Sequence, residues 1–539
     1  MVRGFYVQNF GCRATQSDGA ALERQFEERG LERRLAPGQA EIVIFNTCTV
    51  TASADQDARA AIRRVHRENP TAEIIVTGCY AQRAPEELAS LPGVRRVIGN
   101  SHKHELARIA LGERPQTAPR TSETTGGFVT VASLSGGRSA TPDLPPAPGQ
   151  QSSSNDQPPI FVSDIFAHTD FVSAPVCDAA NERTRPNLKV QDGCDNRCSF
   201  CVIPYVRGQS RSLGLERVVE EVNGLVAGGY REVVISGINL GRWEERSALP
   251  VFTSQKSGLN RHPSAPSVPQ AATDPGSARG LVALTTDERR PATLVLRLTA
   301  LIRAILERTE IEKLRISSVE PMDWTDELIA LVAQSERIAK HAHVPMQSGS
   351  DAVLRRMHRK YRPWHYREKI EKIHAAMPVA AIGADVMVGF PGESDAEFEE
   401  TRRMVEELPF AYLHVFPYSA RPGTPAASLR KQVPASVAGE RGRILRELAA
   451  HKKTSYMRSF VGTMVEAITL REESGASSGG MTKALTDNYL KLMVEGRHEA
   501  NQWIRVRVEG VASDALVGQV AGGRPRLPCA SPLSPSLPS

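Results

Sequence analysis

The sequence predicts an α/β protein built from three ordered domains. We expect a small parallel α/β domain over residues 1–111, a partial barrel of six β/α units over 186–450, and a small β-barrel over 460–520. Three observations predict this order: strand-like and helical runs alternate in the first segment, six such units follow in the second, and short β-type runs separated by glycines end the chain. At 539 residues the chain is too long for one ordinary hydrophobic core.

The first domain is expected to hold a parallel sheet covered by helices. Two stretches of helical composition, 18–29 and 54–68, separate three runs rich in Val, Ile and Phe, which we predict as strands: Phe5–Phe10, Glu41–Phe45 and Glu73–Thr77. Alternation of strand and helix is typical of parallel sheets. In such sheets ligands gather at the carboxyl ends of the strands.

The central domain repeats the strand-helix unit six times. The predicted strands are Leu188–Gln191, Glu232–Ser236, Lys313–Ser317, Ala342–Pro345, Ile382–Val388 and Tyr412–Pro417. Six sequential units with right-handed crossovers favour an open or partial barrel over a closed eightfold one. The active site of such a barrel is expected at the carboxyl ends of its strands.

Two long segments and the end of the chain have a different composition. Residues 112–185 and 245–293 are rich in Thr, Ser, Gly, Pro and Gln, so we predict a low-complexity linker and a disordered loop inserted into the central domain. Residues 521–539 are predicted to be a disordered tail. The sequence gives no functional account of either insert.

Composition and the start of the chain limit the class of protein. The 67 basic and 61 acidic residues give a net charge of +6, which does not by itself require a nucleic-acid partner. The chain begins without a signal-peptide pattern and contains no apolar run of membrane-spanning length, so we expect a cytoplasmic protein without a membrane partner. Eight cysteines in so long a chain argue against a disulfide scaffold.

Three cysteines in one short segment, Cys194, Cys198 and Cys201, are the most informative feature of the sequence. They directly follow the first predicted strand of the central domain. A structural zinc site takes four ligands, and no histidine lies close in sequence, whereas an iron–sulfur cluster held by three thiolates keeps one iron open for a ligand. Phe200 lies where it would stack on that ligand. Zinc and a reduced, unliganded loop remain the alternatives.

A second set of three cysteines is distributed over the first domain. Cys12, Cys48 and Cys79 each follow a predicted strand by a few residues. Parallel strands would bring all three to one edge of the sheet. The alternative is three buried thiols in a core.

Seven segments together resemble the radical S-adenosylmethionine methylthiotransferase family, and most closely its members that modify threonylcarbamoyladenosine in transfer RNA. They are Asn46–Thr51, Ile75–Gln82, Gly193–Gly208, Ser236–Gly241, Arg315–Pro321, His343–Asp351 and Gly383–Glu393. The resemblance implies a methylthiotransferase domain at the N-terminus, a radical SAM barrel in the centre and a TRAM-like RNA-binding domain at the end. The two inserts depart from the compact family pattern.

The resemblance also implies the cofactors and their ligands. Two 4Fe–4S clusters are expected: Cys194, Cys198 and Cys201 would hold the catalytic one, which binds S-adenosylmethionine, and Cys12, Cys48 and Cys79 the auxiliary one, which carries the sulfur to be transferred. Further contacts to the cofactor would come from Phe200, Gly237, Asn239, Glu320, Gln347, Gly389 and Glu393.

The implied function is insertion of sulfur and transfer of a methyl group to C2 of N6-threonylcarbamoyladenosine at position 37 of tRNA. The expected partners are the tRNA anticodon loop and an electron donor such as flavodoxin or ferredoxin, while the sulfur donor stays open. Alternatives are the same chemistry on N6-isopentenyladenosine in tRNA or on a ribosomal protein aspartate. An alternative of another class is a non-catalytic iron–sulfur RNA-binding protein.

Three further polar features of the central domain have two interpretations each. His341 and His343 are interpreted as structural rather than metal-ligating, and Asp385 as either a buried hydrogen-bonded carboxylate or a catalyst. The basic run 355–362 is interpreted either as a solvated helix face or as a phosphate-contacting surface, and the expected RNA substrate favours the second.

Overall fold

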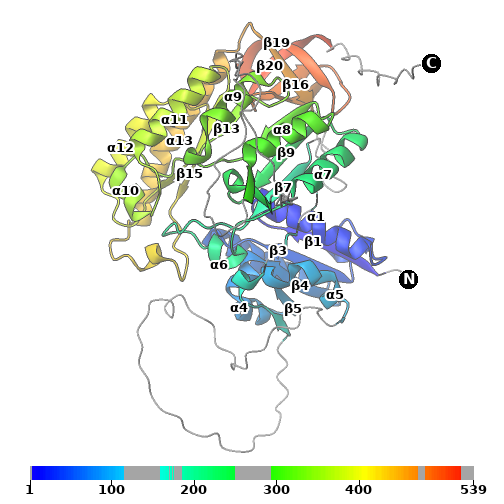
Figure 1. The fold of residues 1–539 in the computed structure, drawn as a ribbon. Helices are drawn as coiled ribbons and strands as arrows, with labels where there is room; N and C mark the ends of the chain where they lie inside the picture. The colour runs from blue at the N-terminus through cyan, green and yellow to red at the C-terminus, as the bar shows by residue number, and fades with distance from the viewer. Residues whose placement is uncertain are drawn as a thin grey trace, which may run out of the picture.

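The computed structural model of the chain describes residues 3–113, 158–168, 170–172, 174, 185–248, 293–471 and 480–523 (Figure 1). In this view the N-terminal domain, in blue, lies below the central domain, and the C-terminal strands, in orange to red, lie at the top. Most of both predicted inserts lies outside the described residues, as do Cys177, Cys529 and residues 524–539. The predicted domain boundaries stay predictions.

The N-terminal domain is a six-stranded parallel sheet with helices on both faces. Its strand order is β2-β1-β3-β4-β5-β6, and the strands are β1 (Gly4–Asn9), β2 (Glu32–Arg33), β3 (Ile42–Thr47), β4 (Glu73–Gly78), β5 (Val94–Gly99) and β6 (Ile160–Phe161). Its helices are α1 (Arg13–Glu27), α2 (Ala52–Glu68), α3 (Cys79–Arg83), α4 (Pro85–Ala89) and α5 (Leu106–Ala110). The edge strand β6 comes from the segment predicted to be a linker.

Two apolar cores form because side chains alternate along the strands. On β3, Ile42 and Ile44 pack with α1 and α5, whereas Val43 and Phe45 pack with α2, α3 and α4. A strand buried on both faces reads as a continuous apolar run, as is usual in parallel sheets. Polar residues begin only at the carboxyl end, with Asn46, and this end therefore carries the chemistry.

The central domain is a partial barrel of six parallel strands, as predicted. They form two three-stranded parts, β7-β9-β12 and β13-β14-β15, joined by an isolated bridge between Leu314 and Ile338. The strands are β7 (Asn187–Asp192), β9 (Glu232–Gly237), β12 (Lys313–Ile316), β13 (His341–His343), β14 (Ala381–Val388) and β15 (Tyr412–Pro417). The helices are α6 (Ile203–Arg207), α7 (Leu215–Ala227), α8 (Leu298–Arg308), α9 (Asp326–Gln334), α10 (Asp351–Arg356), α11 (Pro363–Ala376), α12 (Asp395–Glu407) and α13 (Ala435–Arg458).

The strands of the partial barrel have an apolar outer face and a polar inner face. On β14, Ala384 and Val386 belong to the large core shared with the surrounding helices, whereas Asp385 points to the opposite side. The same alternation places Leu188 in the core and Lys189 on the inner face of β7. The barrel therefore encloses a polar chamber at the carboxyl ends of its strands.

Short elements complete the domain. β8 (Arg211–Ser212) pairs with β7, and β10 (Glu244–Ala248) pairs antiparallel with β11 (Thr293–Arg297). The predicted disordered loop 245–293 is therefore wrong at its two ends, where residues 245–248 and 293 are held in this strand pair. Single 3₁₀ turns lie at η1 (Pro37–Gln39), η2 (Asn100–Glu105), η4 (Ile165–Ala167), η5 (Leu240–Arg242), η6 (Pro321–Asp323) and η7 (Pro425–Ser428).

The C-terminal domain is a closed five-stranded barrel, as predicted. Its order is β16-β17-β18-β20-β19, and its strands are β16 (Met464–Thr469), β17 (Met481–Thr486), β18 (Lys491–Glu495), β19 (Trp503–Ala512) and β20 (Ala515–Gly523). Its apolar core includes Leu492, Val494 and Val506.

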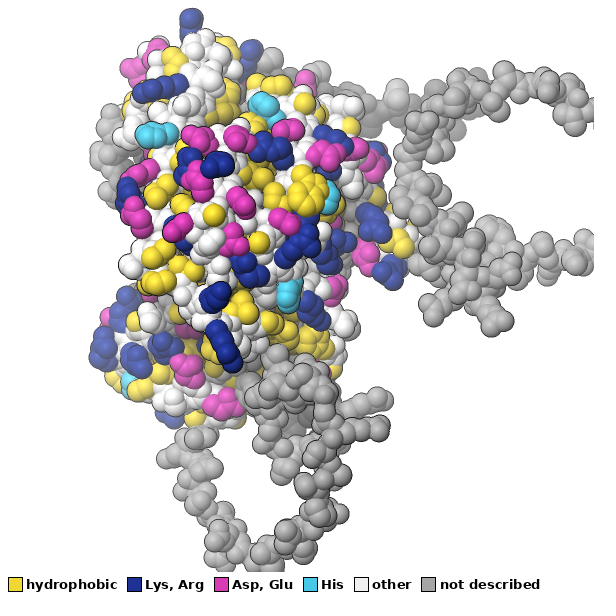
Figure 2. All heavy atoms as spheres, turned by 90° about the vertical axis from the view of Figure 1, so that its left-hand side faces the viewer, with side chains coloured by type: hydrophobic (Ala, Val, Ile, Leu, Met, Phe, Trp, Pro, Cys, Tyr) yellow, Lys and Arg dark blue, Asp and Glu magenta, His cyan; other side chains and the backbone are white. Residues whose placement is uncertain are grey.

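The helical side of the central domain carries both signs of charge. Figure 2 shows Lys and Arg side chains lying among Asp and Glu side chains over much of this face. On α12, for example, Arg402 pairs with Glu399 and Glu406. Exposed pairs of this kind add little stability and leave no single-sign surface. Within the described parts of the chain, every helix is too short or too polar to traverse a lipid bilayer.

Candidate metal and cofactor centre

Cys194, Cys198 and Cys201, here called the loop trio, occupy one turn after β7. Gly193 before them has a φ of +70°, and a Cβ there would lie 1.9 Å from the Gln209 carbonyl oxygen, so only glycine fits. The Cys194 N–H donates to the Gly208 carbonyl at 3.1 Å, and the Cys201 N–H donates to the Cys198 carbonyl at 3.1 Å. Burial, reinforced by the Cys198 thiol, raises the pKa of Cys201 to about 12. The chain thus folds three sulfurs toward one point.

Cys12, Cys48 and Cys79, the sheet trio, lie at the ends of the neighbouring strands β1, β3 and β4. Gly11, with a φ of +98°, approaches Cys48 so closely that a Cβ would lie 2.8 Å from its Sγ. The register pairs Thr47 with Gly78, which places the next residues, Cys48 and Cys79, side by side. Burial first, and then the charges of the other two thiols, raise the pKa of Cys48 to about 12. Three separate strands therefore build a second sulfur site.

Helix α6 connects the two trios. Cys79 is buried against Val202 and Val206, in and next to helix α6, which begins two residues after Cys201. The Asn100 side-chain amide donates to the Val206 carbonyl at 2.7 Å and approaches the Cys79 Sγ at 3.6 Å. In Figure 1, α6 lies between the N-terminal sheet and the rest of the central domain. Helix α6 thus joins the two sets.

The turn after β9 lies next to the loop trio. The Asn239 N–H donates to the Gln191 Oε1 at 2.7 Å, and the Asn239 side-chain nitrogen is 3.6 Å from the Cys194 Sγ. Gly237 leaves room for Gln191, whose Oε1 would lie 2.8 Å from a Cβ at this position. The Asn239 Oδ1 is buried and has no hydrogen-bond partner among the described residues. It is therefore available to a bound ligand.

Glu320 is engaged by an arginine that the sequence analysis missed as a site residue. The Arg359 guanidinium forms an ion pair with Glu320 and donates a hydrogen bond to the Cys198 Sγ at 3.2 Å. Arg359 is only 7% exposed, although it belongs to the basic run predicted to face phosphate. The sequence shows that the basic run contains arginines, but it does not show which of them turns inward toward the cysteines.

Gln347 lies in the chamber with a strained backbone. Its φ is +63°, a left-handed conformation that is uncommon outside glycine, asparagine and aspartate. Its N–H donates to the Asp385 carbonyl at 2.8 Å, and its own carbonyl accepts from the Met387 N–H at 2.9 Å. Its side-chain Oε1 is buried without a hydrogen-bond partner in the described chain. Strain held in place by the backbone, together with a free buried acceptor, is typical of a ligand contact.

Gly389 and Glu393 form a closed turn after β14. Gly389 has a φ of +72°, and its N–H donates to the Glu393 Oε2 at 2.7 Å. Arg441 on α13 pairs with the same carboxylate oxygen at 2.8 Å. Glu393 therefore accepts hydrogen bonds from Gly389 and Arg441, and these contacts hold the turn closed. Phe390 of this turn meets Phe200 edge to face at 6.4 Å, which connects the turn to the loop trio.

The donor sets fit the groups that the resemblance implies. Each trio offers three thiols, which is the number that a 4Fe–4S cluster with one open iron takes. Around the loop trio, the buried and unpartnered oxygens of Asn239 and Gln347 suit the polar groups of S-adenosylmethionine. The roles of the six cysteines as cluster ligands and of the cofactor-contacting residues stay predictions.

A buried network of charges lies between the trios. Asp18 on α1 pairs with Lys103 at 3.0 Å and with Arg207 at 2.8 Å, and Asp192 pairs with Lys189 at 2.7 Å and with Arg207 at 2.9 Å. Burial alone would raise the pKa of Asp18, but Arg207, Lys103 and Lys189 hold it well below its ordinary value. Three cationic side chains thus share two carboxylates beside the cysteines. The only sequence signal was a lysine inside a buried strand.

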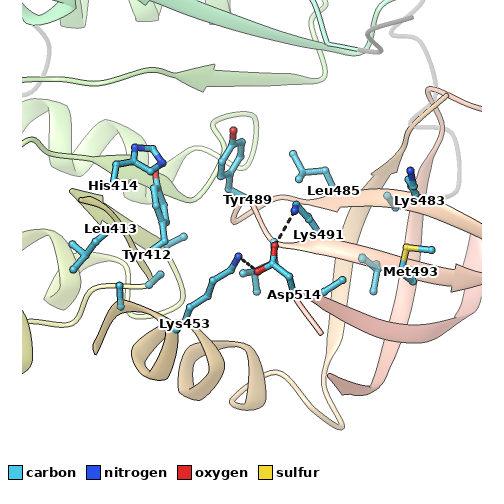
Figure 3. A pocket seen from close by; sticks show the side chains of 18 of the residues that line it. Tyr412, Leu413, His414, Lys453, Lys483, Leu485, Tyr489, Lys491, Met493 and Asp514 are labelled. Carbon is cyan, nitrogen blue, oxygen red and sulfur yellow. Dashed lines mark hydrogen bonds and ion pairs between the residues drawn. The ribbon is translucent and has the colours of Figure 1, made fainter. Parts of the chain in front are cut away.

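A cavity of about 680 Å³ opens between the central domain and the C-terminal barrel (Figure 3). Tyr412 and Tyr489 contribute aromatic surface to it. Asp514 is paired with Lys491 at 2.8 Å and with Lys453. The cationic residues that line the cavity are Arg185, Arg446, Lys453, Lys483 and Lys491. Cationic and aromatic groups in one concave surface are typical of nucleic-acid contact.

Comparison with known proteins decides the family. Residues 4–99 match the model described as uncharacterized protein family UPF0004, and residues 280–405 match the radical SAM superfamily. A threonylcarbamoyladenosine tRNA methylthiotransferase MtaB of Bacillus subtilis (strain 168) is 32% identical over 91% of this chain and 90% of its own length. The chain belongs to the radical SAM methylthiotransferase family.

Further relatives are named for the same nucleoside or for a different one. The MtaB protein of Aquifex aeolicus (strain VF5) is 30% identical over 93% of this chain and 99% of its own length. A tRNA-2-methylthio-N(6)-dimethylallyladenosine synthase of Novosphingobium aromaticivorans is 30% identical over 87% of this chain and 86% of its own length. The solved structure of the radical SAM methyltransferase TsrM from Kitasatospora setae matches with a TM-score of 0.46 and 15% identity, over 79% of this chain and 77% of that chain.

Membership in this family confirms the resemblance drawn from the seven sequence segments. The radical SAM match implies one 4Fe–4S cluster and S-adenosylmethionine. The three-domain α/β architecture is confirmed as well.

Proposed function

We propose that this chain methylthiolates C2 of N6-threonylcarbamoyladenosine at position 37 of tRNA, with two 4Fe–4S clusters and S-adenosylmethionine. The observation that carries the proposal is the presence of two separate cysteine trios near α6: Cys79 of the sheet trio packs against Val202 and Val206, and the loop trio ends two residues before the helix begins. The MtaB relatives, which match over most of their length, support the choice of nucleoside. Since tRNA is the substrate, we place the reaction in the cytoplasm.

The reaction needs radical chemistry because the C2–H bond of adenine is not activated toward acid or base. Cys194, Cys198 and Cys201 would hold a cluster that, with S-adenosylmethionine and a one-electron donor such as flavodoxin or ferredoxin, would supply the radical chemistry. Asn239 and Gln347, which have free buried acceptors, orient the bound cofactor, and Arg359 fixes Glu320 beside it.

The sheet trio holds the second cluster, at which the sulfur is carried. Arg207 lies close enough to Cys79 and Cys12 for their charges to interact. A fixed cation in a buried site stabilises negative charge without having to reorganise. Arg207 therefore favours anionic sulfur at this position, whatever donor delivers it.

The C-terminal barrel and its cavity bind the tRNA. Lys483 and Lys491 on neighbouring strands offer charge to the phosphate backbone, and Tyr489 offers a ring for stacking. The cavity also includes Tyr412, the first residue of β15, and the Tyr489 hydroxyl of the barrel accepts a hydrogen bond at 3.3 Å from Arg13, which follows Cys12.

Nucleoside analysis of tRNA from a deletion strain tests the substrate. We expect loss of 2-methylthio-N6-threonylcarbamoyladenosine, recovery with the intact gene, and no recovery with Cys48→Ala. Retention of this nucleoside with loss of the methylthiolated dimethylallyl or isopentenyl form would assign the substrate of the other relatives. Unchanged tRNA with loss of a methylthio group from ribosomal protein would assign the aspartate reaction.

A separate assay tests catalysis itself. Reduced, cluster-loaded protein with S-adenosylmethionine is expected to form 5′-deoxyadenosine. Absence of this product, with tRNA binding intact, would support the non-catalytic RNA-binding alternative.

A further inference from the structure

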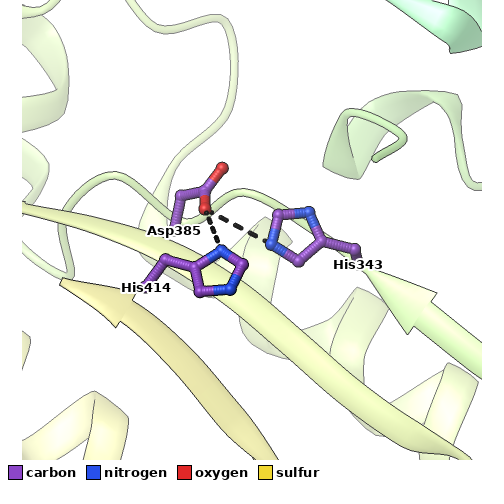
Figure 4. A group of neighbouring side chains, drawn as sticks. All are labelled: His343, Asp385 and His414. Carbon is purple, nitrogen blue, oxygen red and sulfur yellow. Dashed lines mark hydrogen bonds and ion pairs between the residues drawn. The ribbon is translucent and has the colours of Figure 1, made fainter. Parts of the chain in front are cut away.

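Three potential metal ligands, none of them in either cysteine trio, converge on the inner face of the partial barrel. His343, Asp385 and His414 come from the neighbouring strands β13, β14 and β15 (Figure 4). The His343 Nε2 lies 3.3 Å from the Asp385 Oδ1, and the His414 Nδ1 lies 3.2 Å from the same oxygen. All three ligand atoms lie within 4.8 Å of one another. Register pairs Asp385 with His414, so the backbone itself sets this arrangement.

The hydrogen bonds of His343 resemble those of a metal-ligating histidine. The Ser318 hydroxyl lies 2.6 Å from its Nδ1, which fixes the ring and leaves the Nε2 directed at Asp385. Histidines that bind metals are commonly held through their second nitrogen in this way. The His343 side chain is only 8% exposed, and its Nε2 has no hydrogen-bond partner of normal geometry among the described residues. A buried nitrogen aimed into a cluster without such a partner indicates a missing ligand.

The charges around Asp385 also indicate a site for a cation. Two other buried strand carboxylates have strong cations: Asp192, at the carboxyl end of β7, pairs with Arg207, and Glu232, at the amino end of β9, pairs with Arg315 at 2.7 Å. Asp385, by contrast, is matched with two imidazoles, both at distances longer than the usual 2.7–2.9 Å of a charge-assisted hydrogen bond. One carboxylate oxygen facing two imidazole nitrogens has space and charge for a cation.

We propose that His343, Asp385 and His414 bind a divalent transition metal, and that this metal is Zn²⁺. Imidazole and carboxylate suit this class of ion, and three protein ligands leave one coordination position open, as in catalytic zinc sites. His414 is 63% exposed and lines the cavity at the C-terminal barrel. The open position therefore faces this cavity and takes a water or an anionic oxygen. This assignment replaces the structural role interpreted for His343.

Zinc binding to the cluster-loaded, full-length protein tests the site. Equilibrium dialysis against ⁶⁵Zn²⁺ is expected to give about one zinc ion per chain beyond the cluster iron. Asp385→Asn and His343→Gln are expected to weaken binding at least about tenfold. His365→Gln, at an exposed histidine of α11, is the matched control and is expected to bind like the unchanged protein. Equal binding by Asp385→Asn and the unchanged protein would overturn the proposal.

The zinc absorption edge identifies the ligands independently of affinity. We expect nitrogen and oxygen neighbours at about 2.0–2.1 Å, with imidazole scattering. A sulfur shell at about 2.3 Å would place the zinc on cysteines and overturn the proposal. If the buried variants fail to fold, as judged by thermal unfolding, His414→Gln at the exposed position gives the same test.

Discussion

The chain brings the three thiols of each trio together in a different way. The loop trio comes from eight consecutive residues after one strand, and its shape is set by backbone hydrogen bonds from Cys201 to Cys198 and from Cys194 to the nearby Gly208. The sheet trio comes from three strand ends up to 67 residues apart, and the parallel register brings them together. A local site depends on its own turn, whereas an assembled site depends on the whole sheet.

The surroundings of the trios differ as well. The loop trio has polar ligand-type neighbours, Asn239 at Cys194 and Arg359 at Cys198. The sheet trio adjoins the charge network around Asp18 and Arg207. One site is equipped to hold a polar cofactor, and the other to stabilise anionic sulfur.

The largest expected difference is between Cys198→Ala and Cys48→Ala. Both variants are expected to lose the methylthiolated product. Cys198→Ala is also expected to lose 5′-deoxyadenosine formation, because the cofactor-binding cluster is gone, whereas Cys48→Ala keeps uncoupled cleavage. Anaerobic single-turnover assays measure both products. Equal loss of both activities in Cys48→Ala would contradict a division of labour between the trios.

Glycine substitutions separate the trios without touching a sulfur. Gly78 has a φ of +99°, and a Cβ there would lie 2.3 Å from the Thr47 carbonyl oxygen, while Gly193 is similarly confined by Gln209. Each alanine is expected to cost about 1–3 kcal/mol in backbone strain, beyond the clash. Gly78→Ala is expected to lose iron from the sheet trio and Gly193→Ala from the loop trio, as measured by electron paramagnetic resonance. Gly30→Ala, in open space with a φ of +77°, controls for strain alone.

The charge network near the sheet trio predicts a pH dependence of stability. The pKa of Asp18 is lowered in the folded protein, so its contribution is complete above its unfolded value of about 3.9 and is lost as the pH falls toward the folded value. Asp18→Asn is expected to destabilise the protein at pH 7 by about 3–5 kcal/mol, because Lys103 and Arg207 lose a buried partner. The Asp18→Asn variant is also expected to lose less stability than the unchanged protein as the pH falls from about 5 to about 3. Chemical unfolding measured across this range checks both effects, and an unchanged acid slope would contradict them.

The smallest expected effect concerns the cavity between the central domain and the C-terminal barrel. Lys483→Gln is expected to weaken tRNA binding several-fold and to reduce the salt dependence of log K by about one charge. Lys372→Gln, on α11, is the matched control. Filter binding at several salt concentrations measures the slope, and equal slopes for the two variants would remove Lys483 from the RNA contact.

Features with local causes were predictable from the sequence. The six central strands follow from apolar runs, and both trios follow from cysteines placed after strands. The strand β5 was missed because Arg95 and Arg96 interrupt its apolar pattern. The pairing of Glu393 with Arg441 and the inward turn of Arg359 depend on packing between distant segments, which spacing along the chain does not reveal.

Iron and sulfide content, with Mössbauer spectra, tests the central claim of two separate clusters most directly. Anaerobically loaded protein is expected to hold about eight iron atoms per chain. Replacing either trio with alanine is expected to leave about four, with the spectrum of one intact 4Fe–4S cluster. Four iron atoms in the unchanged protein, or loss of all iron on removal of a single trio, would contradict two independent sites.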